Sequence, residues 1–538
     1  MATDVVSTEA AGSGVRPVPW GRGDELLLLA FSAVFLAAAL LSAHRKILAG
    51  DELVTYSVAT LPSASDVWAA IVGGDVLPPL GHFLTRASIA LLGPSHVAIR
   101  LPEVIGCWWM SICIYLFVRR YTPTAAAGVA LLVPMCTAAY TFAYEARPYG
   151  LMLGAGAAVL LCWQRATEGA NRWGWLIGLT LSVAAALSSH WYALLVMIPL
   201  GLGELVRLLR RRRFDIPMWT AIVVGVLPLI GFLPIIRTGR SIQHLTAPQW
   251  TLRSSALAVV DAYHSLLQGS ALMFLAILLI LAGFAARTST RGTRPLAAAV
   301  PPEVLAAILG FLMIPVAGVI LASAAIGEFN ARYVLLTVVG VAAAAGLGTA
   351  QLTARGRATG TALLAAAIVA SLSQAARAKI GLQERSAIAE QSGVFAIFRC
   401  SSALTRSTAP IVVTDIQSYG VLSFYAPETL ATRFVYVTEY NAMASAVARR
   451  MNPQRGWRTM EYAELRDRTP TFFLYESQYA TGQITSPLLA RLVVDGNRIG
   501  DSGCIDPRDV YPRPGQLYEV TNPRARSDVA DRSSAPEK

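Results

Sequence analysis

The sequence predicts an α-helical polytopic membrane protein with a C-terminal extracytoplasmic α/β domain. Of its 538 residues, 54% are hydrophobic and only 14% are charged, and the mean hydropathy is +0.51. Soluble domains carry about 25% charged residues, so this composition excludes a cytosolic enzyme. A net charge of +12 would suggest nucleic acid as the partner of a soluble chain. Here the basic residues collect between apolar runs, so we expect a membrane and no nucleic acid.

Eleven apolar runs have about the length of a membrane helix, since a span needs about 20 residues to cross about 30 Å of hydrocarbon. They fall near residues 26–43, 97–118, 123–143, 149–163, 173–189, 191–206, 216–236, 266–286, 303–326, 333–352 and 361–377. Each run predicts a transmembrane helix, and the runs at 149–163 and 191–206 are short.

The orientation follows from basic residues, which gather in every second loop and mark the cytoplasmic side. They are Arg119, Arg120, Arg165, Arg172, Arg207, Arg210 to Arg213, Arg287, Arg291, Arg294, Arg355 and Arg357. The predicted parts are a cytoplasmic tail (1–23), a transmembrane domain (24–377) with a first outer loop (44–96), and an outer domain (378–538). The tail lacks the pattern of a signal peptide. We therefore expect a multi-pass protein of the inner or plasma membrane.

The outer domain changes composition. Apolar β-rich runs at 409–414, 433–437 and 471–475 alternate with helix-like stretches at 441–451 and 486–492, which predicts an α/β domain. Cys400 and Cys504 are its only cysteines. An oxidising compartment would permit a disulfide between them, and free thiols are the alternative.

Polar residues of the first outer loop are the first candidates for chemistry. Asp51 and Glu52 follow the first span, where a carboxylate could act as a general base or simply face water. Asp75 and His82 flank a proline pair that fixes a stiff bend. The amphipathic stretch 83–92 fits either the membrane interface or a re-entrant packing element.

Three short turns bring more polar groups to the same predicted face. The first holds Tyr144, Glu145, Arg147 and Tyr149, the second His190, and the third Arg332 and Tyr333. Arg147 could bind a phosphate through its fork of donors or pair with Glu145. His190 could equally be a hydrogen-bonded interfacial histidine, and Arg332 could snorkel to the membrane surface.

Several common sites lack sequence support. The chain has neither a Gly-x-x-x-x-Gly-Lys-Ser/Thr loop nor a His-Glu-x-x-His or Cys-x-x-Cys motif, so ATP-driven transport and a zinc site are not expected. An Asp-x-Asp motif for a metal-held nucleotide sugar is also absent. A divalent cation bound by carboxylates is an alternative that the sequence leaves open. The chain shows no internal repeat, so an inverted-repeat transporter gains no support.

Taken in order, these motifs resemble the GT-C integral-membrane glycosyltransferases, in the bacterial branch related to protein O-mannosyltransferases and the lipid A aminoarabinose transferase. The resemblance rests on Asp51-Glu52, Asp75-x-x-Pro78-Pro79-Leu80, Leu92-Gly93, Arg100-Leu101-Pro102, Glu145-x-Arg147-Pro148-Tyr149 and Arg332-Tyr333. It covers about residues 24–350 and is strongest over residues 50–165.

The resemblance implies a glycosyltransferase that moves a sugar from a polyprenyl-phosphate carrier to an acceptor at the outer membrane face, with inversion. Asp51 would be the general base, with Glu52 as its neighbour or substitute. The implied substrate-binding residues are Asp75, His82, Tyr144, Glu145, Arg147, Tyr149, His190, Arg332 and Tyr333. The implied partners are the lipid-linked sugar and an acceptor lipid, glycan or protein, and no residue is assigned as a metal ligand.

Two other functions compete with this interpretation. A transporter or a flippase of lipid-linked sugars would fit the number of spans, but a carrier places polar residues in the middle of its spans. In this chain they lie at the predicted outer ends of helices. A non-catalytic assembly partner would have lost the acid of the first loop, which is present as Asp51-Glu52. Because Lys46 is the only lysine before Lys379, arginines are expected to face the donor phosphate.

Overall fold

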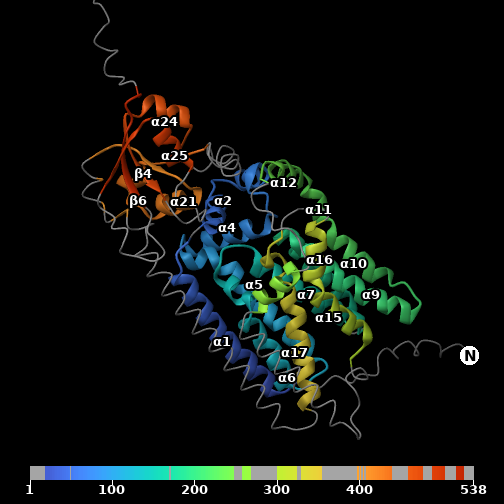
Figure 1. Cartoon of the computed structure of the whole chain (residues 1–538). Helices are drawn as coiled ribbons and strands as arrows, with labels where there is room; N and C mark the ends of the chain where they lie inside the picture. The colour runs from blue at the N-terminus through green and yellow to red at the C-terminus, as the bar shows by residue number, and fades with distance from the viewer. Residues whose placement is uncertain are drawn as a thin grey trace, which may run out of the picture. The chain divides into compact units, whose positions relative to one another are not determined.

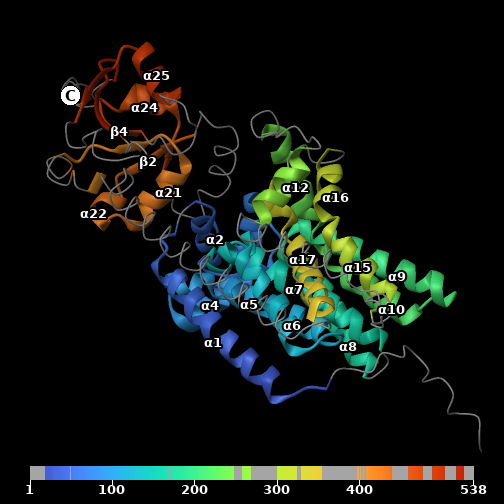
Figure 2. The same ribbon diagram turned by 60° about the horizontal axis from the view of Figure 1, so that its bottom comes forward.

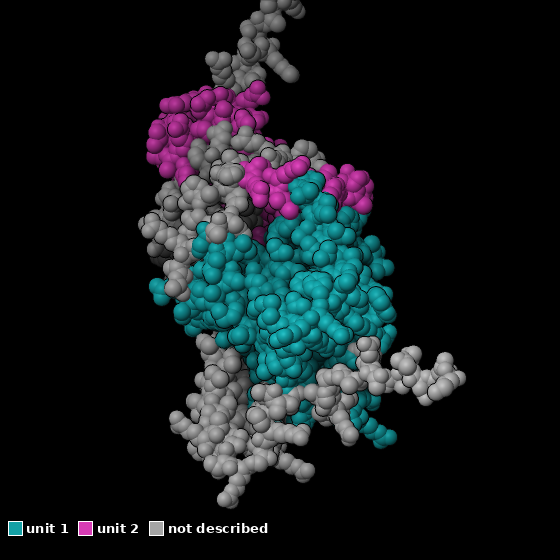
Figure 3. Space-filling model, turned by 90° about the vertical axis from the view of Figure 1, so that its right-hand side faces the viewer, with its two compact units in different colours: residues 1–44, 77–234, 247–379 teal, residues 45–76, 235–246, 380–538 magenta. Residues whose placement is uncertain are grey.

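The computed structural model describes residues 19–48, 50–168, 171–246, 257–267, 300–323, 329–353, 397–398, 400, 404, 407–438, 458–476, 487–502 and 516–525. The chain forms two compact units, shown in teal and magenta in Figure 3. Unit 1 comprises residues 1–44, 77–234 and 247–379, and unit 2 comprises residues 45–76, 235–246 and 380–538. Unit 2 thus combines part of the predicted first outer loop (44–96), a short segment at 235–246 and the predicted outer domain (378–538).

Unit 1 is helical, as the apolar runs predict (Figure 1). Its main helices are α1 (Arg22–Arg45), α4 (Leu80–Leu92), α5 (His96–Arg119), α6 (Thr124–Leu132), α7 (Tyr149–Thr167), α8 (Arg172–Ser189), α9 (Met197–Arg211), α10 (Ile216–Val226), α11 (Pro228–Gly231), α15 (Pro302–Leu312), α16 (Ile314–Leu321) and α17 (Thr337–Thr353). Short 3₁₀ helices are η2 (Val133–Cys136), η3 (Ala138–Tyr144), η4 (Trp191–Val196) and η6 (Ala331–Val334). The predicted spans near 266–286 and 361–377 lie outside the described residues, apart from 266 and 267 at the end of the helix Leu257–Leu267.

Several helices of unit 1 have the length and hydropathy of a membrane span. Within the described ranges, three unbroken helices qualify, and the number rises to six if each of three bent pairs is one span. The pairs bend by 69°, 55° and 49°, and Pro134, Pro234 and Pro315 lie beside the three breaks. Proline lacks an amide hydrogen and clashes with the preceding turn, which explains the bends. The chain is a multi-pass membrane protein.

Helices α5 and α7 pack closely against each other (Figures 1 and 2). A Cβ atom added to Gly106 would lie 2.4 Å from the carbonyl oxygen of Gly150, so the two backbones touch. Gly150 and Gly154 are spaced as in the small-residue motifs that let membrane helices approach. The carboxylate of Glu103 also accepts a hydrogen bond from the Leu151 amide at 2.9 Å. These contacts fix the first turn of α7.

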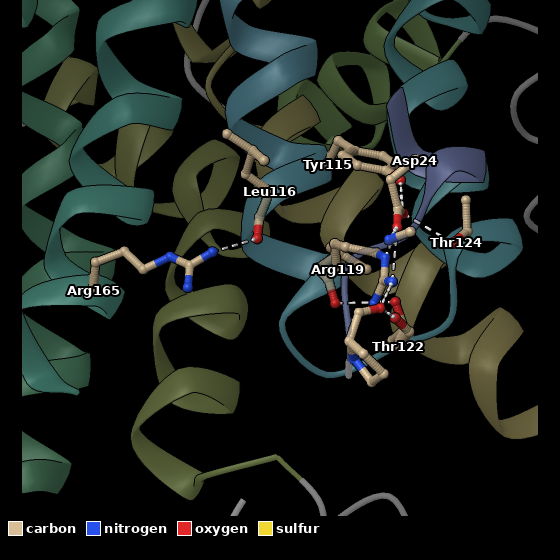
Figure 4. A network of polar contacts seen from close by, with 10 residues as sticks. Asp24, Tyr115, Leu116, Arg119, Thr122, Thr124 and Arg165 are labelled. Atoms are coloured by element: carbon tan, nitrogen blue, oxygen red, sulfur yellow. Dashed lines mark hydrogen bonds and ion pairs between the residues drawn. The ribbon is translucent and has the colours of Figure 1, made fainter. Parts of the chain in front are cut away.

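A buried polar network joins the start of α1 to the end of α5 (Figure 4). The Arg119 guanidinium donates to both carboxylate oxygens of Asp24, with Nε at 2.5 Å and Nη2 at 2.9 Å. The hydroxyls of Tyr115 and Thr124 donate to the same carboxylate at 2.5 and 2.9 Å. Both members of the ion pair are buried, so each depends on the other for its charge compensation.

Substitution of Asp24 by alanine is therefore expected to destabilise unit 1. It leaves the Arg119 guanidinium buried without its partner, which costs about 3–5 kcal/mol in the free energy of unfolding. Denaturant titration in mixed micelles measures this change. Tyr115→Phe is the control, since it removes one hydrogen bond and should cost only about 1 kcal/mol. Equal losses for the two variants would contradict a dominant ion pair.

The C-terminal part of unit 2 is an α/β domain, as the sequence predicts. Its strands are β1 (Ile411–Val413), β2 (Phe434–Val437), β3 (Thr459–Met460), β4 (Thr471–Glu476), β5 (Arg498–Asp501) and β6 (Gln516–Thr521), in the order β3-β2-β1-β4-β6-β5. The first four are parallel, and β6 pairs antiparallel with both β4 and β5. The described helices of this domain are α21 (Ile416–Tyr425), α22 (Glu428–Ala431), α24 (Tyr462–Arg468) and α25 (Pro487–Val494).

The two faces of this sheet pack against separate hydrophobic clusters. Alternate residues of β1 and β4 point to opposite sides: Ile411 and Phe473 belong to one cluster, and Val412 and Phe472 to the other. Strands buried on both faces are apolar throughout, which is why these runs stand out in the sequence. The predicted helix at 441–451 lies outside the described residues, whereas the stretch 486–492 matches α25.

The outer domain has two cysteines, and the structure describes one of them. Cys400 is buried and disulfide-bonded. Its predicted partner, Cys504, lies outside the described residues, so the pairing itself stays a prediction. The described cysteines of the helical unit, Cys107, Cys113, Cys136 and Cys162, are buried and form no disulfide.

Candidate functional site

The two predicted catalytic carboxylates begin helix α2 (Asp51–Ala59) of unit 2. Gly50, just before it, has a φ of 50°, a conformation that glycine adopts at little cost. Glu52 is buried, with a side-chain exposure of 4%, and forms an ion pair with Lys46 at 3.3 Å. Asp51 is half-buried. The adjacent acids therefore differ, because Glu52 ties α2 to the preceding chain while Asp51 is the more accessible carboxylate.

Helix α2 packs against α21 of the α/β domain, within the same unit. The Leu48 amide donates a hydrogen bond to the Tyr425 hydroxyl at 2.8 Å. The rings of Tyr56 and Phe424 meet edge to face, with centroids 5.1 Å apart. Leu53 faces Gly420, where an added Cβ would lie 3.6 Å from the leucine Cδ1. The outer domain thus holds the helix that begins with Asp51.

Asp75 closes an irregular turn of the same unit. Helix α3 (Ala64–Ala70), which starts at a Ser63–Asp66 capping box, runs into the π-helix η1 (Ile71–Asp75). The next residue, Val76, has a φ of 51°, a conformation that β-branched residues rarely adopt. An added Cβ on Gly239 of α12 (Leu233–Thr246) would lie 3.8 Å from the Val76 Cβ. Such irregular backbone is often found at functional sites.

In unit 1, the turn that carries Glu145 and Arg147 leads directly into α7. The Arg147 amide donates to the Glu145 carbonyl at 2.7 Å, and the Tyr149 amide donates to the Arg147 carbonyl at 2.6 Å. Pro148 caps the helix. A Cβ on Gly81 would lie 3.1 Å from the Pro148 Cβ, so the first turn of α4, which carries the buried His82, packs on this turn.

Three tyrosine rings gather around the buried His190, which lies between α8 and η4. Its ring centroid lies 5.0 Å from Tyr149, 5.9 Å from Tyr192 and 6.1 Å from Tyr333. Tyr192 and Tyr333 stack at 4.3 Å with an interplanar angle of 10°. The Arg332 guanidinium carbon lies 5.5 Å from the centroid of the Tyr333 ring. Three turns that are distant in the sequence thus meet at one aromatic cluster.

The electrostatics of His190 connect this cluster to both candidate arginines. Burial lowers the pKa of the imidazole, and the positive charges of Arg147 and Arg332 lower it further, to about 3. His190 is therefore neutral at physiological pH. Since both arginines act on the same imidazole, they lie within electrostatic range of one small region. An anion that entered this region would meet two cations and no protonated histidine.

The structure therefore brings together five predicted residues of unit 1, which are Arg147, Tyr149, His190, Arg332 and Tyr333. Tyr144 has a different setting, since it packs against Tyr140 at 5.7 Å in the hydrophobic core. Tyr192, which the sequence pattern does not single out, also belongs to this cluster and stands two positions after His190 in the same turn. Its stacking on Tyr333 depends on a contact between turns about 140 residues apart.

A metal site would need several ligating side chains close together. Across the described ranges, no group of three or more His, Cys, Asp or Glu side chains is arranged to hold a metal ion. The candidate residues thus form two separate sets, the arginines and aromatic rings of unit 1 and the acids of the first outer loop in unit 2.

Comparisons with known proteins agree with this architecture. Residues 76–237 match the family model described as dolichyl-phosphate-mannose-protein mannosyltransferase. The crystal structure of ArnT from Cupriavidus metallidurans in the apo state is similar, with a TM-score of 0.59, 13% identity, and coverage of 95% of this chain and 99% of that chain. The structure of the same protein bound to undecaprenyl phosphate gives a TM-score of 0.61 and 14% identity, with coverage of 93% and 99%.

A comparison with curated proteins found no significant match. The family match runs from α4 to the start of α12, which includes the turn of Arg147 and the turn of His190. The structural likeness extends over nearly the whole chain and includes the outer domain. The chain therefore has the fold of the GT-C integral-membrane glycosyltransferases, and its residues 76–237 match the mannosyltransferase family within it.

Proposed function

We propose that the protein transfers a sugar from a polyprenyl-phosphate carrier to an acceptor at the outer face of the inner or plasma membrane, with inversion. The main support is the convergence of Arg147 and Arg332 on the buried His190, in a fold shared with a protein that has been crystallised with undecaprenyl phosphate. In this proposal the N-terminus is cytoplasmic and the outer domain is extracytoplasmic.

In the proposed mechanism, Asp51 accepts the proton of the acceptor hydroxyl. The oxygen then attacks the anomeric carbon of the sugar, and the bond from that carbon to the phosphate oxygen breaks with its electron pair. Asp51 is the better candidate of the two acids because Glu52 is buried in its ion pair with Lys46. A buried, paired carboxylate gives up favourable interactions if it binds a proton.

The leaving group is a lipid phosphate, which gains negative charge as the bond breaks. Arginines stabilise such charge because their planar guanidinium presents several donors to phosphate oxygens. We assign this role to Arg147 and Arg332. His190 is neutral and so leaves the positive charge of the site to the two arginines. Its ring can exchange hydrogen bonds with sugar hydroxyls. The faces of Tyr149 and Tyr333 offer apolar surface to the sugar ring.

The remaining predicted residues are proposed to complete the substrate site. Asp75, His82, Tyr144 and Glu145 would bind or orient the sugar and its acceptor. The energy for transfer comes from the sugar-phosphate bond, so the mechanism needs no nucleotide. A divalent cation held by carboxylates would be an addition to this scheme, and transfer measured with and without a chelator tests it.

Turnover of a lipid-linked sugar in reconstituted membranes tests the proposed function. Radiolabelled sugars on undecaprenyl or decaprenyl phosphate are supplied with a membrane extract as acceptor, and both carrier loss and label transfer are followed. We expect the sugar to leave the carrier and to appear on an acceptor. Movement of the intact carrier between leaflets, without loss of its sugar, would instead support a flippase.

The contact between α2 and α21 leads to a further prediction. Tyr425→Phe removes the hydrogen bond to the Leu48 amide, which is worth about 0.5–1.5 kcal/mol, and should lower the rate of sugar transfer by about 2- to 10-fold by loosening α2. Tyr462→Phe is the matched control, since it removes a hydrogen bond to Asp495 in the same domain. It should leave the rate unchanged.

A second measurement separates positioning of Asp51 from general destabilisation of the domain. If Tyr425 acts through Asp51, then Tyr425→Phe should have no further effect on the residual rate of an Asp51→Asn enzyme. Multiplicative losses in the double variant would contradict the positioning role. The melting temperatures of the two tyrosine variants show whether their effects on stability are comparable.

A further inference from the structure

A second polar site lies in unit 1 at the turn between α9 and α10. A cavity of about 550 Å³ is lined by residues of this turn and by the first residue of α8, Arg172. Helix α9 begins after the His190 turn and ends at the cavity, so its 15 residues separate the two sites by about 22 Å. The sequence predicts this turn to be cytoplasmic. The cavity is thus distinct from the candidate transferase site.

The walls of the cavity are held by charged side chains from three helices. Asp215, the N-cap residue of α10, receives hydrogen bonds from Arg207 at 2.5 Å and from Arg172. Glu204 accepts from Arg207 at 3.0 Å and from the indole of Trp163 at 2.6 Å. Burial opposes ionisation of Asp215, but the hydrogen bonds from the two arginines outweigh it and lower its pKa. Both acids are therefore already engaged by donors of the protein.

The cavity nevertheless has an excess of positive charge. Arg211 and Arg213 also line it, and neither makes an ion pair with any described residue. The four arginines and two acids give a formal charge of +2. In addition, the buried Nε atoms of Arg172 and Arg207 have no hydrogen-bond acceptor among the described residues. Only an anion supplies the missing charge and acceptors together.

The surroundings of the cavity indicate that this anion carries acyl chains. Phe214 and Ile216, which line it, are 57% and 67% exposed. The rings of Phe214 and Trp219 stack at 5.6 Å. On α9, Leu205 and Leu209 are also exposed. In a membrane protein such residues face lipid, and aromatic rings at helix ends lie at headgroup depth.

We propose that this cavity binds the phosphate headgroup of an anionic glycerophospholipid, with Arg211 and Arg213 as its phosphate ligands and Arg172 and Arg207 as the fixed wall. Basic cavities at the cytoplasmic ends of membrane helices are suited to such headgroups. A lipid bound in this cavity would anchor helices α8 to α10 in the membrane. The proposed sugar transfer takes place at the opposite predicted face.

Four consecutive arginines stand at 210–213, and the last three of them provide a matched control because Arg210 is paired with Glu303. Arg212 lies between the two proposed ligands but does not line the cavity, since its φ of 52° turns the chain at this point. Substitution of any one of the three by glutamine removes the same charge from the same turn. A specific site predicts unequal effects, whereas general attraction to an anionic surface predicts equal ones.

The test measures binding of phosphatidylglycerol to the purified full chain by native mass spectrometry, with phosphatidylcholine as the neutral comparison. Arg211→Gln and Arg213→Gln should each weaken phosphatidylglycerol binding about fivefold, and the double variant about 30-fold, given the usual contribution of a basic residue near a membrane surface. Arg212→Gln should change it by less than about twofold. Melting temperatures check that all variants are folded.

Three results would overturn the proposal. Equal losses for all three single variants would indicate general surface charge. Binding of phosphatidylcholine as tightly as phosphatidylglycerol would show that the net negative charge of the headgroup is not recognised. Displacement of phosphatidylglycerol by inorganic phosphate or by undecaprenyl phosphate, at lower concentration than by phosphatidylglycerol itself, would assign the cavity to another phosphate source.

Discussion

Asp51→Asn is expected to lower the rate of sugar transfer by about two to four orders of magnitude while the protein stays folded. The amide keeps the size of the carboxylate and the first position of α2, but it cannot accept the proton of the acceptor hydroxyl. The measurement is the single-turnover rate of label transfer from the polyprenyl-phosphate sugar. Binding of the donor should be little changed, because the base acts on the acceptor.

Glu52→Gln is the matched control, one residue further along the same helix. It weakens the ion pair with Lys46, so a loss of stability is expected, together with a much smaller loss of transfer than for Asp51→Asn. If Asp51→Asn stayed active and Glu52→Gln did not, the assignment of the base would move by one residue. If both stayed active, catalysis by the acids of the first outer loop would be refuted.

Replacement of both Arg147 and Arg332 by glutamine is the second change with a large expected effect. Loss of one preorganised donor to a developing negative charge commonly lowers the rate 10²- to 10³-fold, so the double variant should lose at least about 10³-fold. Lysine at both positions keeps the charge but not the fork of donors, and should retain part of the rate. Near-normal turnover of the double glutamine variant would contradict the proposed role.

The same double variant has a readout that does not depend on activity. Both arginines lower the pKa of His190, so their removal should raise it from about 3, while burial keeps it below its ordinary value. NMR titration of the labelled histidine measures this shift. In the wild type, the neutral form of His190 persists through physiological pH, and no step of transfer between pH 5 and 8 should follow its titration.

Much of the architecture follows from local sequence patterns. Each apolar run that falls on described residues is helical, and the three bends lie beside prolines. Strands β1, β2 and β4 of the outer domain are largely apolar because both of their faces are buried. Turns that carry charges between apolar helices also stand out, because charge near a membrane is costly unless it is used. Such features depend on residues close together in the chain.

The contacts of the candidate site residues could be recognised only in the tertiary structure. The sequence places Asp51 and Glu52 side by side, and the structure adds that Glu52 is buried in an ion pair with Lys46. The Leu48–Tyr425 hydrogen bond joins residues 377 positions apart, and no local pattern indicates it.

The aromatic cluster and the arginine cavity show the same limit. The stacking of Tyr192 on Tyr333 and the bridging of two arginines by Asp215 depend on how helices pack in three dimensions. Hydropathy and turn chemistry act over a few residues, and so the sequence by itself determines the elements and their order. Ion pairs, ring stacking and cavities arise from contacts between distant segments, which only the packed chain decides.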